Sequence, residues 1–220
     1  MDGTLREWSI SEKRQLRACR LDIDDKGSVL PLSTDKRSKG DVQEQGKLMC
    51  VGIDMKDSTA IVGCKDGTIR VVDLKKFTQK AMVKLAKEWI SDIKFSPNND
   101  KVAVGSHDDA IYILSYPDLK LKRGARMKKH SSFITHIDWS VCGNFLHSNC
   151  GAYELLFWDA NGYKQMTSGA TSLRDEWWHT WSCVLGWPVG GIFRDNWDGS
   201  DVNMVWRSST EFGYDQKYYV

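Results

Sequence analysis

A repeat of 42–44 residues constrains the fold of this chain more than any other feature of the sequence. Three short apolar runs, each entered through a polar turn, recur as DGTIRVVDL, DDAIYILSY and AYELLFWDA. Their equivalent positions, Asp73, Ser115 and Asp159, are 42 and 44 residues apart. A unit of this length built from four short strands is typical of one β-propeller blade. We therefore expect an all-β propeller made of four-stranded blades.

A second element repeats in step with the first. WISDIKFS and FITHIDWS place Phe95 and Trp139 44 residues apart, and each is followed by a turn and a further apolar strand. Trp158 and Asp159 form the Trp-Asp dipeptide that ends the third strand of a WD40 blade, and His130 precedes Asp159 by 29 residues. The blades are therefore expected to be of the WD40 type.

The repeat accounts for only part of a propeller. Its three whole units are fewer than the roughly four to eight blades that propellers usually carry. DGTLREWSI, near the start, resembles the third strand of another unit. We expect a partial propeller of about three whole blades plus two flanking pieces. Its expected parts are the end of a preceding blade (1–21), a polar inter-strand loop (22–47), two WD blades (48–87 and 88–129), a degenerate WD blade (130–182) and the start of a next blade (183–220).

The charge balance and the cysteines argue against several classes of protein. Lys and Arg number 31 against 29 Asp and Glu, so bulk charge does not indicate a nucleic-acid partner. No apolar run approaches the roughly 20 residues that span a bilayer, so we expect no membrane partner. Six cysteines without a CxxC pair indicate reduced thiols. His147 and Cys150 have only the distant Cys142 or His136 to complete a zinc site, so no metal or cofactor is expected.

The sequence contains no convincing catalytic constellation. Ser106, His107 and Asp108 include the residue types of a catalytic triad, but adjacent residues cannot converge on one substrate atom. No glycine-rich phosphate loop occurs either. We expect a protein that is not an enzyme, in which polar residues at the turns form hydrogen-bond networks that support the blades. The residues expected in these structural networks are Ser106, Asp108, His130, Ser148, Trp158 and Asp159.

The segment LKLKRGARMKKH (119–130) carries six basic side chains and no acidic one. It joins two expected blades and should lie on the surface, where connecting segments are exposed. A solvated linker is one interpretation. The other is a contact with an acidic partner, because an uncompensated basic run on a nearly neutral protein creates a local positive field. The candidate partner-binding residues are Lys120, Lys122, Arg123, Arg126, Lys128 and Lys129.

The segment EWWHTWSCVLGW (176–187) places four tryptophans in twelve positions. If Trp181 begins a strand, Trp181, Cys183, Leu185 and Trp187 share one face, because side chains alternate along a strand. An exposed platform that stacks a ligand is one interpretation, and packing inside the propeller is the other. We favour packing, since buried aromatic side chains mostly serve cores.

The order of several motifs resembles a known family. SFITHIDWS, YELLFWDANGYKQMTS, WWHTWSCVLGWPVGGIF and DGSDVN follow one another as in the propeller region of the echinoderm microtubule-associated protein-like family. KEWISDIKFSPNNDKVAVGSHDDAIYI, GCKDGTIRV and DGTLREWS resemble it too. The resemblance implies a tandem pair of unequal propellers, with this chain drawn from the later blades of the first. It transfers no tubulin-contacting residue to this sequence.

The resemblance implies a non-enzymatic scaffold that binds tubulin or microtubules in the cytoplasm and cytoskeleton, or in the axoneme of a cilium or flagellum. Other cytoskeletal or axonemal proteins are the further partners expected. The alternative hypothesis is a WD40 adaptor that presents protein partners to signalling or ubiquitin-ligase machinery. Microtubule binding would distinguish the two, because the adaptor hypothesis predicts peptide binding without it.

Overall fold

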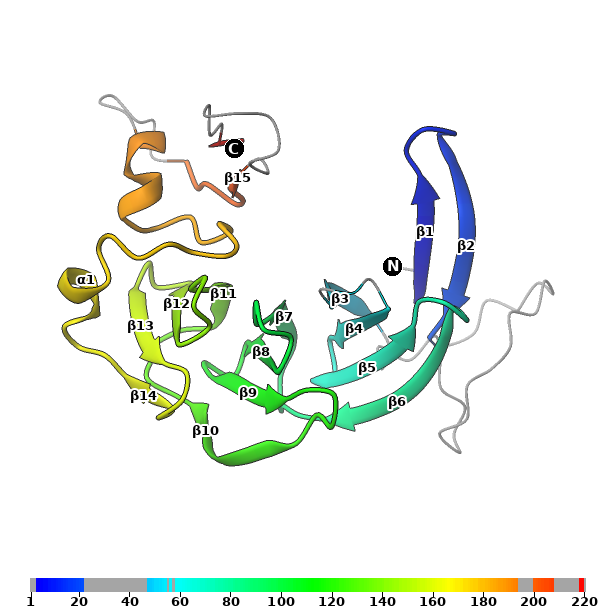
Figure 1. Cartoon of the computed structure of the whole chain (residues 1–220), viewed down its shortest axis with the longest axis horizontal. Coiled ribbons are helices and arrows are strands. Elements are labelled where there is room, and N and C mark those ends of the chain that lie inside the picture. Colours follow the sequence, from blue (N-terminus) through cyan, green and yellow to red (C-terminus); the bar gives the residue numbers. More distant parts are fainter. Residues whose placement is uncertain are drawn as a thin grey trace. The chain divides into compact units, whose positions relative to one another are not determined.

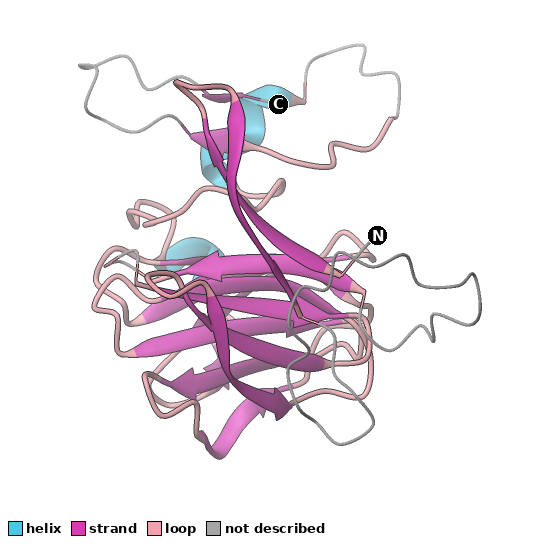
Figure 2. Ribbon diagram, turned by 90° about the vertical axis from the view of Figure 1, so that its right-hand side faces the viewer, coloured by secondary structure: helices cyan, strands magenta, loops and turns pink. Residues whose placement is uncertain are grey.

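The computed structural model describes residues 3–21, 47–54, 56, 58–193, 200–207 and 218–219. It divides into two compact units, residues 1–93 and 94–220. The expected polar loop at 22–47 lies outside the described residues except for Lys47. No helix among the described residues is long and apolar enough to cross a membrane. Strands dominate both units, and helices are short (Figure 2).

The first unit contains a hairpin and a four-stranded antiparallel sheet (Figure 1). The hairpin consists of β1 (Thr4–Ser9) and β2 (Arg14–Arg20). The sheet has the strands in chain order: β3 (Leu48–Ile53), β4 (Thr59–Cys64), β5 (Thr68–Asp73) and β6 (Thr78–Lys84). A buried cluster that includes Cys19, Leu21, Val62 and Val72 packs the hairpin against the sheet.

The second sheet begins with β7 (Ile90–Phe95), inside which the division between the units falls. Its other strands are β8 (Lys101–Ser106), β9 (Ile111–Ser115) and β10 (Leu121–Met127), again in chain order. The third sheet consists of β11 (Ile134–Trp139), β12 (Phe145–Cys150), β13 (Leu155–Asp159) and β14 (Lys164–Gln165). After it come α1 (Gly169–Ser172), the 3-10 helix η1 (Trp187–Ile192), and the paired strands β15 (Trp206–Arg207) and β16 (Tyr218–Tyr219).

The central strands β4, β5 and β8 are rich in β-branched residues and are buried on both faces. The fourth strands β6 and β10 are mostly exposed. In the second unit, the second and third sheets pack around Trp139 and Trp158, both of which are almost fully buried. Gly105 permits this approach, because a Cβ on Gly105 would lie 2.7 Å from the Ile134 Cγ2.

The turns repeat with the strands. Gly67, Asp109 and Tyr153 all have positive φ values, between 60° and 79°, at positions 42 and 44 residues apart. Phe77, Leu119 and Tyr163 form a second such series with the same spacings. Tyrosine and phenylalanine rarely adopt this left-handed conformation, so the blade geometry imposes it. The expected all-β fold built from four-stranded antiparallel blades is confirmed.

Candidate functional site

The basic segment is mostly an edge strand. The sequence suggested a connection between blades, but Leu121–Met127 form β10, the fourth strand of its sheet. Ala125 and Met127 point inward and are buried, which holds the strand in place. Between Leu121 and Arg126 the register with β9 shifts, and Gly124 has a φ of 85°. Basic side chains on such an edge discourage pairing with further strands, which is one reason for their presence.

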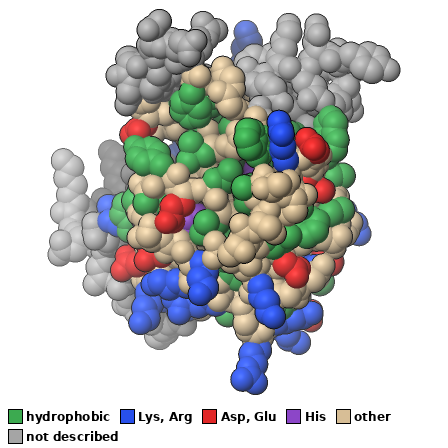
Figure 3. Space-filling model, turned by 90° about the vertical axis from the view of Figure 1, so that its left-hand side faces the viewer, with side chains coloured by type: hydrophobic (Ala, Val, Ile, Leu, Met, Phe, Trp, Pro, Cys, Tyr) green, Lys and Arg blue, Asp and Glu red, His purple; other side chains and the backbone are tan. Residues whose placement is uncertain are grey.

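Three of the six candidate basic residues have acidic neighbours. Lys120 lies 3.6 Å from Asp118, and Lys128 lies 3.5 Å from Asp109. Both pairs are exposed, so they contribute little to stability. Across the ranges that the structure describes, Lys122, Arg123 and Lys129 have no ion-pair partner. Lys and Arg side chains gather in the lower part of the face shown in Figure 3.

Arg126 has a structural role that the sequence did not indicate. Its guanidinium donates to Asp108 at 3.2 Å and stacks over the ring of Tyr112. The Tyr112 hydroxyl donates to the same Asp108 oxygen at 2.5 Å. Burial, followed by the bond to Asp108, raises the pKa of Tyr112 to about 12. Arg126 is therefore engaged within its own blade, and it is the least available of the six candidates.

The expected network of the third sheet comes together around the Ser148 hydroxyl. Trp158 donates its indole N–H to this hydroxyl at 2.8 Å, and His130 Nε2 lies 2.7 Å from it. Glu154, which the sequence analysis missed, lies 3.1 Å from His130 Nδ1 and accepts bonds from the Ser131 N–H and hydroxyl. Ala152 occupies the turn position that Asp66 and Asp108 occupy in the first two sheets, and Glu154 supplies the missing carboxylate.

The remaining members of the expected networks serve local turns. Ser106 accepts a bond from the Asp108 N–H at 3.2 Å. Asp159 accepts bonds from the N–H groups of Asn161 and Gly162, so it caps a turn and lies apart from the His130 network. Asp73, its equivalent in the first sheet, caps Lys75 and Lys76 in the same way.

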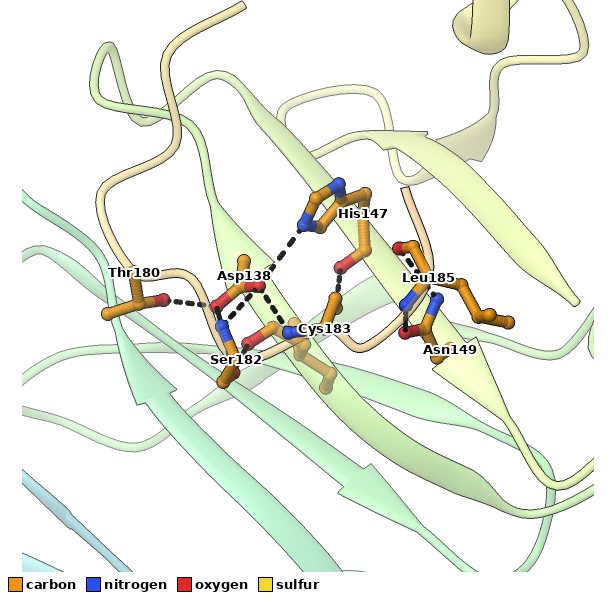
Figure 4. Close-up of polar contacts among 8 residues, drawn as sticks. Asp138, His147, Asn149, Thr180, Ser182, Cys183 and Leu185 are labelled. Carbon is orange, nitrogen blue, oxygen red and sulfur yellow. Dashed lines mark hydrogen bonds and ion pairs between the residues drawn. The ribbon is translucent and has the colours of Figure 1, made fainter. Parts of the chain in front are cut away.

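A second network surrounds the fully buried Asp138 (Figure 4). Its carboxylate accepts bonds from the Thr180 hydroxyl at 2.6 Å, the Ser182 N–H and hydroxyl, and the Cys183 N–H at 2.8 Å. His147 Nε2 lies 3.1 Å from it. Burial alone would raise the pKa of Asp138, but the bonds and charge from His147 and the other donors hold it well below its usual range. Asp138 attaches the segment after the third sheet to the face of that sheet.

The four tryptophans of residues 176–187 divide into buried and exposed members. Trp178 is 1% exposed and stacks on the His147 ring at a centroid distance of 3.7 Å. Cys183 is buried, and Trp181 and Leu185 are half-buried. Trp187, expected among the packing residues, is 60% exposed, and its indole N–H donates to the Ala170 carbonyl.

The strand expected from Trp181 is not formed. The N–H groups of Ser182 and Cys183 donate to the Asp138 carboxylate in place of a neighbouring strand. Leu185 exchanges two hydrogen bonds with the Asn149 side chain, and η1 then begins at Trp187. This segment, residues 176–187, therefore lies across the sheet as an irregular strap, and side-chain alternation does not apply to it.

Among the residues that the structure describes, two side-chain groups each bring together three potential metal ligands: His130 with Cys150 and Glu154, and Asp138 with His147 and Cys183. His147 and Cys150, paired in the sequence analysis, fall in different groups. Asp138 and Glu154 already accept several hydrogen bonds each, and burial raises the pKa of the Cys150 thiol above its ordinary value. These contacts account for both groups as structural networks.

Comparison with known proteins decides the family. The profile of the echinoderm microtubule-associated protein second beta-propeller matches residues 1–212. The chain belongs to the echinoderm microtubule-associated protein family. The expectation that it comes from the first propeller is therefore corrected. The motifs of a WD40 blade recur in every blade, so they did not indicate which propeller carries them.

Among its relatives, echinoderm microtubule-associated protein-like 3 of Mus musculus is 36% identical over 86% of this chain and 20% of its own length. Ciliary WD repeat-containing protein ctxp80 of Euplotoides octocarinatus is 34% identical over 95% of the chain and 29% of its length. The 77 kDa echinoderm microtubule-associated protein of Lytechinus variegatus is 48% identical over 56% and 18%, respectively. The chain thus spans less than a third of the length of these relatives.

A solved structure supports the fold independently. A chain in the crystal structure of the mitotic checkpoint complex has a TM-score of 0.58 and 13% identity, covering 74% of this chain and 44% of that one. At this identity the likeness concerns the fold alone. The family and the fold are those of WD-repeat propellers, and the matches indicate no enzymatic family.

Proposed function

We propose that the protein is a non-enzymatic scaffold that binds tubulin or microtubules and organises cytoskeletal assemblies. The family membership supports this proposal, because the matched relatives are named for microtubule association. The ciliary name of the Euplotoides octocarinatus relative supports the axoneme of a cilium or flagellum as one setting. Other cytoskeletal or axonemal proteins are the further partners that we propose.

The observation that carries the proposal in this chain is the exposed basic strand β10. Lys122 and Arg123 project from its irregular middle section, and Lys129 follows its end. Exposed charges without a compensating carboxylate attract an acidic surface over about a Debye length, which is ~8 Å at physiological salt. Lys120 and Lys128 can also contribute, because their exposed ion pairs are weak. The contact surface that we propose is therefore the sequence-derived set without Arg126: Lys120, Lys122, Arg123, Lys128 and Lys129.

Co-sedimentation of the full-length protein with microtubules tests this function. We expect the protein in the pellet at physiological salt, with less binding as salt increases. A protein that stays in the supernatant with microtubules, yet binds short peptides, would instead be the WD40 adaptor of the alternative hypothesis.

A further inference from the structure

The fourth strand of the third sheet is cut short. β6 and β10 have seven residues each, whereas β14 has two. After Gln165 the Met166 N–H still donates to the Phe157 carbonyl at 2.8 Å, and the chain then turns into α1. Gly169 makes this turn possible, because a Cβ there would lie 2.3 Å from the Phe157 Cβ. The chain therefore leaves β13 after Met166 and does not continue as a fourth strand.

A cavity of about 390 Å³ lies at this position. Met127, at the end of β10, lines one side, and Trp158 and Tyr163 of the third sheet line the other. Met127 and Trp158 belong to the buried cluster between the two sheets and are only 4% and 1% exposed, so they form the floor of the cavity, and the half-buried Tyr163 ring is its accessible apolar wall. Its volume is that of a small ligand site and suits one or two side chains of a peptide.

The rim of the cavity is basic. Lys128 and Lys129 approach from the segment after β10, and Lys164 approaches from β14. Lys128 is near Asp109, but Lys129 and Lys164 have no ion-pair partner among the described residues. Gln165 and Thr167 also line the cavity, and no described side chain or backbone group bonds to their side chains. The cavity thus combines an apolar wall with two uncompensated cations and two available hydrogen-bonding groups.

We propose that this cavity binds an acidic peptide segment of a protein partner, seating one apolar side chain against the Tyr163 ring. Carboxylates beside that side chain pair with Lys129 and Lys164. The complementarity of charge selects the acidic segment, and the apolar wall selects the residue between the acids. This inference rests on the proposed function, because the acidic segment would belong to the cytoskeletal partner.

Fluorescence anisotropy with a labelled peptide tests the cavity directly. The probe is a run of glutamates with one central phenylalanine, added to the full-length protein. Replacing its phenylalanine by alanine should weaken binding about threefold or more, since the contact between the phenylalanine and Tyr163 rings is lost. Replacing its glutamates by glutamine should abolish binding. Equal binding of all three peptides, or none, would overturn the proposal.

Variants of the lining residues test whether the probe binds at this cavity. K129E/K164E should weaken probe binding about tenfold or more through repulsion, and K129R/K164R should bind as the unchanged protein does. K75E/K76E, with the same change of charge at an exposed turn of the first unit, is the matched control. Thr167→Trp should also weaken binding, because it fills the cavity without altering any charge. Unchanged binding by K129E/K164E and Thr167→Trp, with unfolding midpoints equal to that of the unchanged protein, would contradict the proposal.

Microtubule co-sedimentation of the unchanged protein, beside its binding of the probe, separates the two proposals. If the probe fails to bind while the unchanged protein still sediments, only the cavity proposal is overturned. If the probe binds at the cavity while the protein does not sediment, the cavity is supported as an acidic-peptide site and the proposed microtubule function fails.

Discussion

Asp138 binds Ser182, which follows it by 44 residues, through both of its carboxylate oxygens. The Ser182 N–H lies 3.0 and 2.9 Å from the two oxygens, and the Ser182 hydroxyl donates to one of them at 2.9 Å. Both residues are buried, so these charge-assisted bonds are shielded from water. One carboxylate on β11 therefore fixes the path of the strap that covers the third sheet.

Asp138→Asn should destabilise the protein strongly. The amide would present N–H groups to donors that now face a carboxylate oxygen, and it would leave His147 without its anionic partner. Loss of one partner from such a buried charged network costs about 3–5 kcal/mol. Chemical denaturation measures the change in the free energy of unfolding. The matched control is Asp175→Asn, an exposed carboxylate near the same strap, which should change it by less than about 0.5 kcal/mol.

The His130 network should make stability depend on pH. Burial lowers the pKa of His130 below its ordinary 6.5, so the folded protein keeps this imidazole neutral where the unfolded chain protonates it. The stabilisation from neutral His130 is fully present above pH 6.5 and decreases as the pH falls below that value.

Thermal unfolding of His130→Gln at pH 7.5 and pH 5 checks this dependence. The difference in midpoint between the variant and the unchanged protein should shrink at the lower pH. His179→Gln, at a half-buried histidine of the strap, serves as the control. A difference for His130→Gln that is the same at both pH values would show that His130 does not titrate as the structure requires.

Glu154 should make the stability of the protein depend on pH in a more acidic range than His130 does. Hydrogen bonds from the Ser131 N–H, then from Cys150 and the Ser131 hydroxyl, lower the pKa of Glu154 to about 2. Its contribution is present above the unfolded value near 4.5 and is lost as the pH falls toward 2. Glu154→Gln should therefore destabilise the protein at pH 6 and have a smaller effect at pH 3. Equal destabilisation at both pH values, by chemical denaturation, would argue against an ionised Glu154.

Arg126→Gln and Lys122→Gln should change the free energy of unfolding by different amounts, although both remove one positive charge from β10. Loss of Arg126 takes a donor from the buried Asp108 carboxylate, which should cost about 1 kcal/mol. Lys122 is exposed, so its loss should change the free energy of unfolding by less than about 0.5 kcal/mol. If chemical denaturation gives both variants the same free energy of unfolding, the structural role assigned to Arg126 is wrong.

The sequence predicted the blades because each uses the same local signals. Apolar strands and polar turns recur every 42–44 residues, and the left-handed turn residues Gly67, Asp109 and Tyr153 have the same spacing. Trp158 and Ser148 could be placed with His130 for the same reason. The placement within the family's second propeller could not be predicted, because blade motifs are shared by both propellers.

The strap could not be predicted from the repeat. In the repeat alignment, Lys94 occupies the place of Asp138, and Ala103 occupies that of His147. The Asp138 network therefore has no counterpart in the preceding unit, and it depends on a tertiary contact. The exposure of Trp187 was missed for the same reason. A carboxylate on a strand whose neighbours Ile137 and Trp139 are apolar was the one available signal.

Microtubule co-sedimentation across a salt series tests the proposed function and its contact surface together. The key variant changes Lys120, Lys122, Arg123, Lys128 and Lys129 to glutamine in the full-length protein and retains Arg126 for stability. Its control removes the same charge from exposed positions of the first unit: Lys13, Lys56, Lys75, Lys76 and Lys87.

We predict that the unchanged protein and the control sediment with microtubules, less so as salt increases, and that the β10 variant binds about tenfold more weakly. Absence of the unchanged protein from the pellet at physiological salt would contradict the proposed function. Equal binding by the β10 variant and the control would contradict the contact surface.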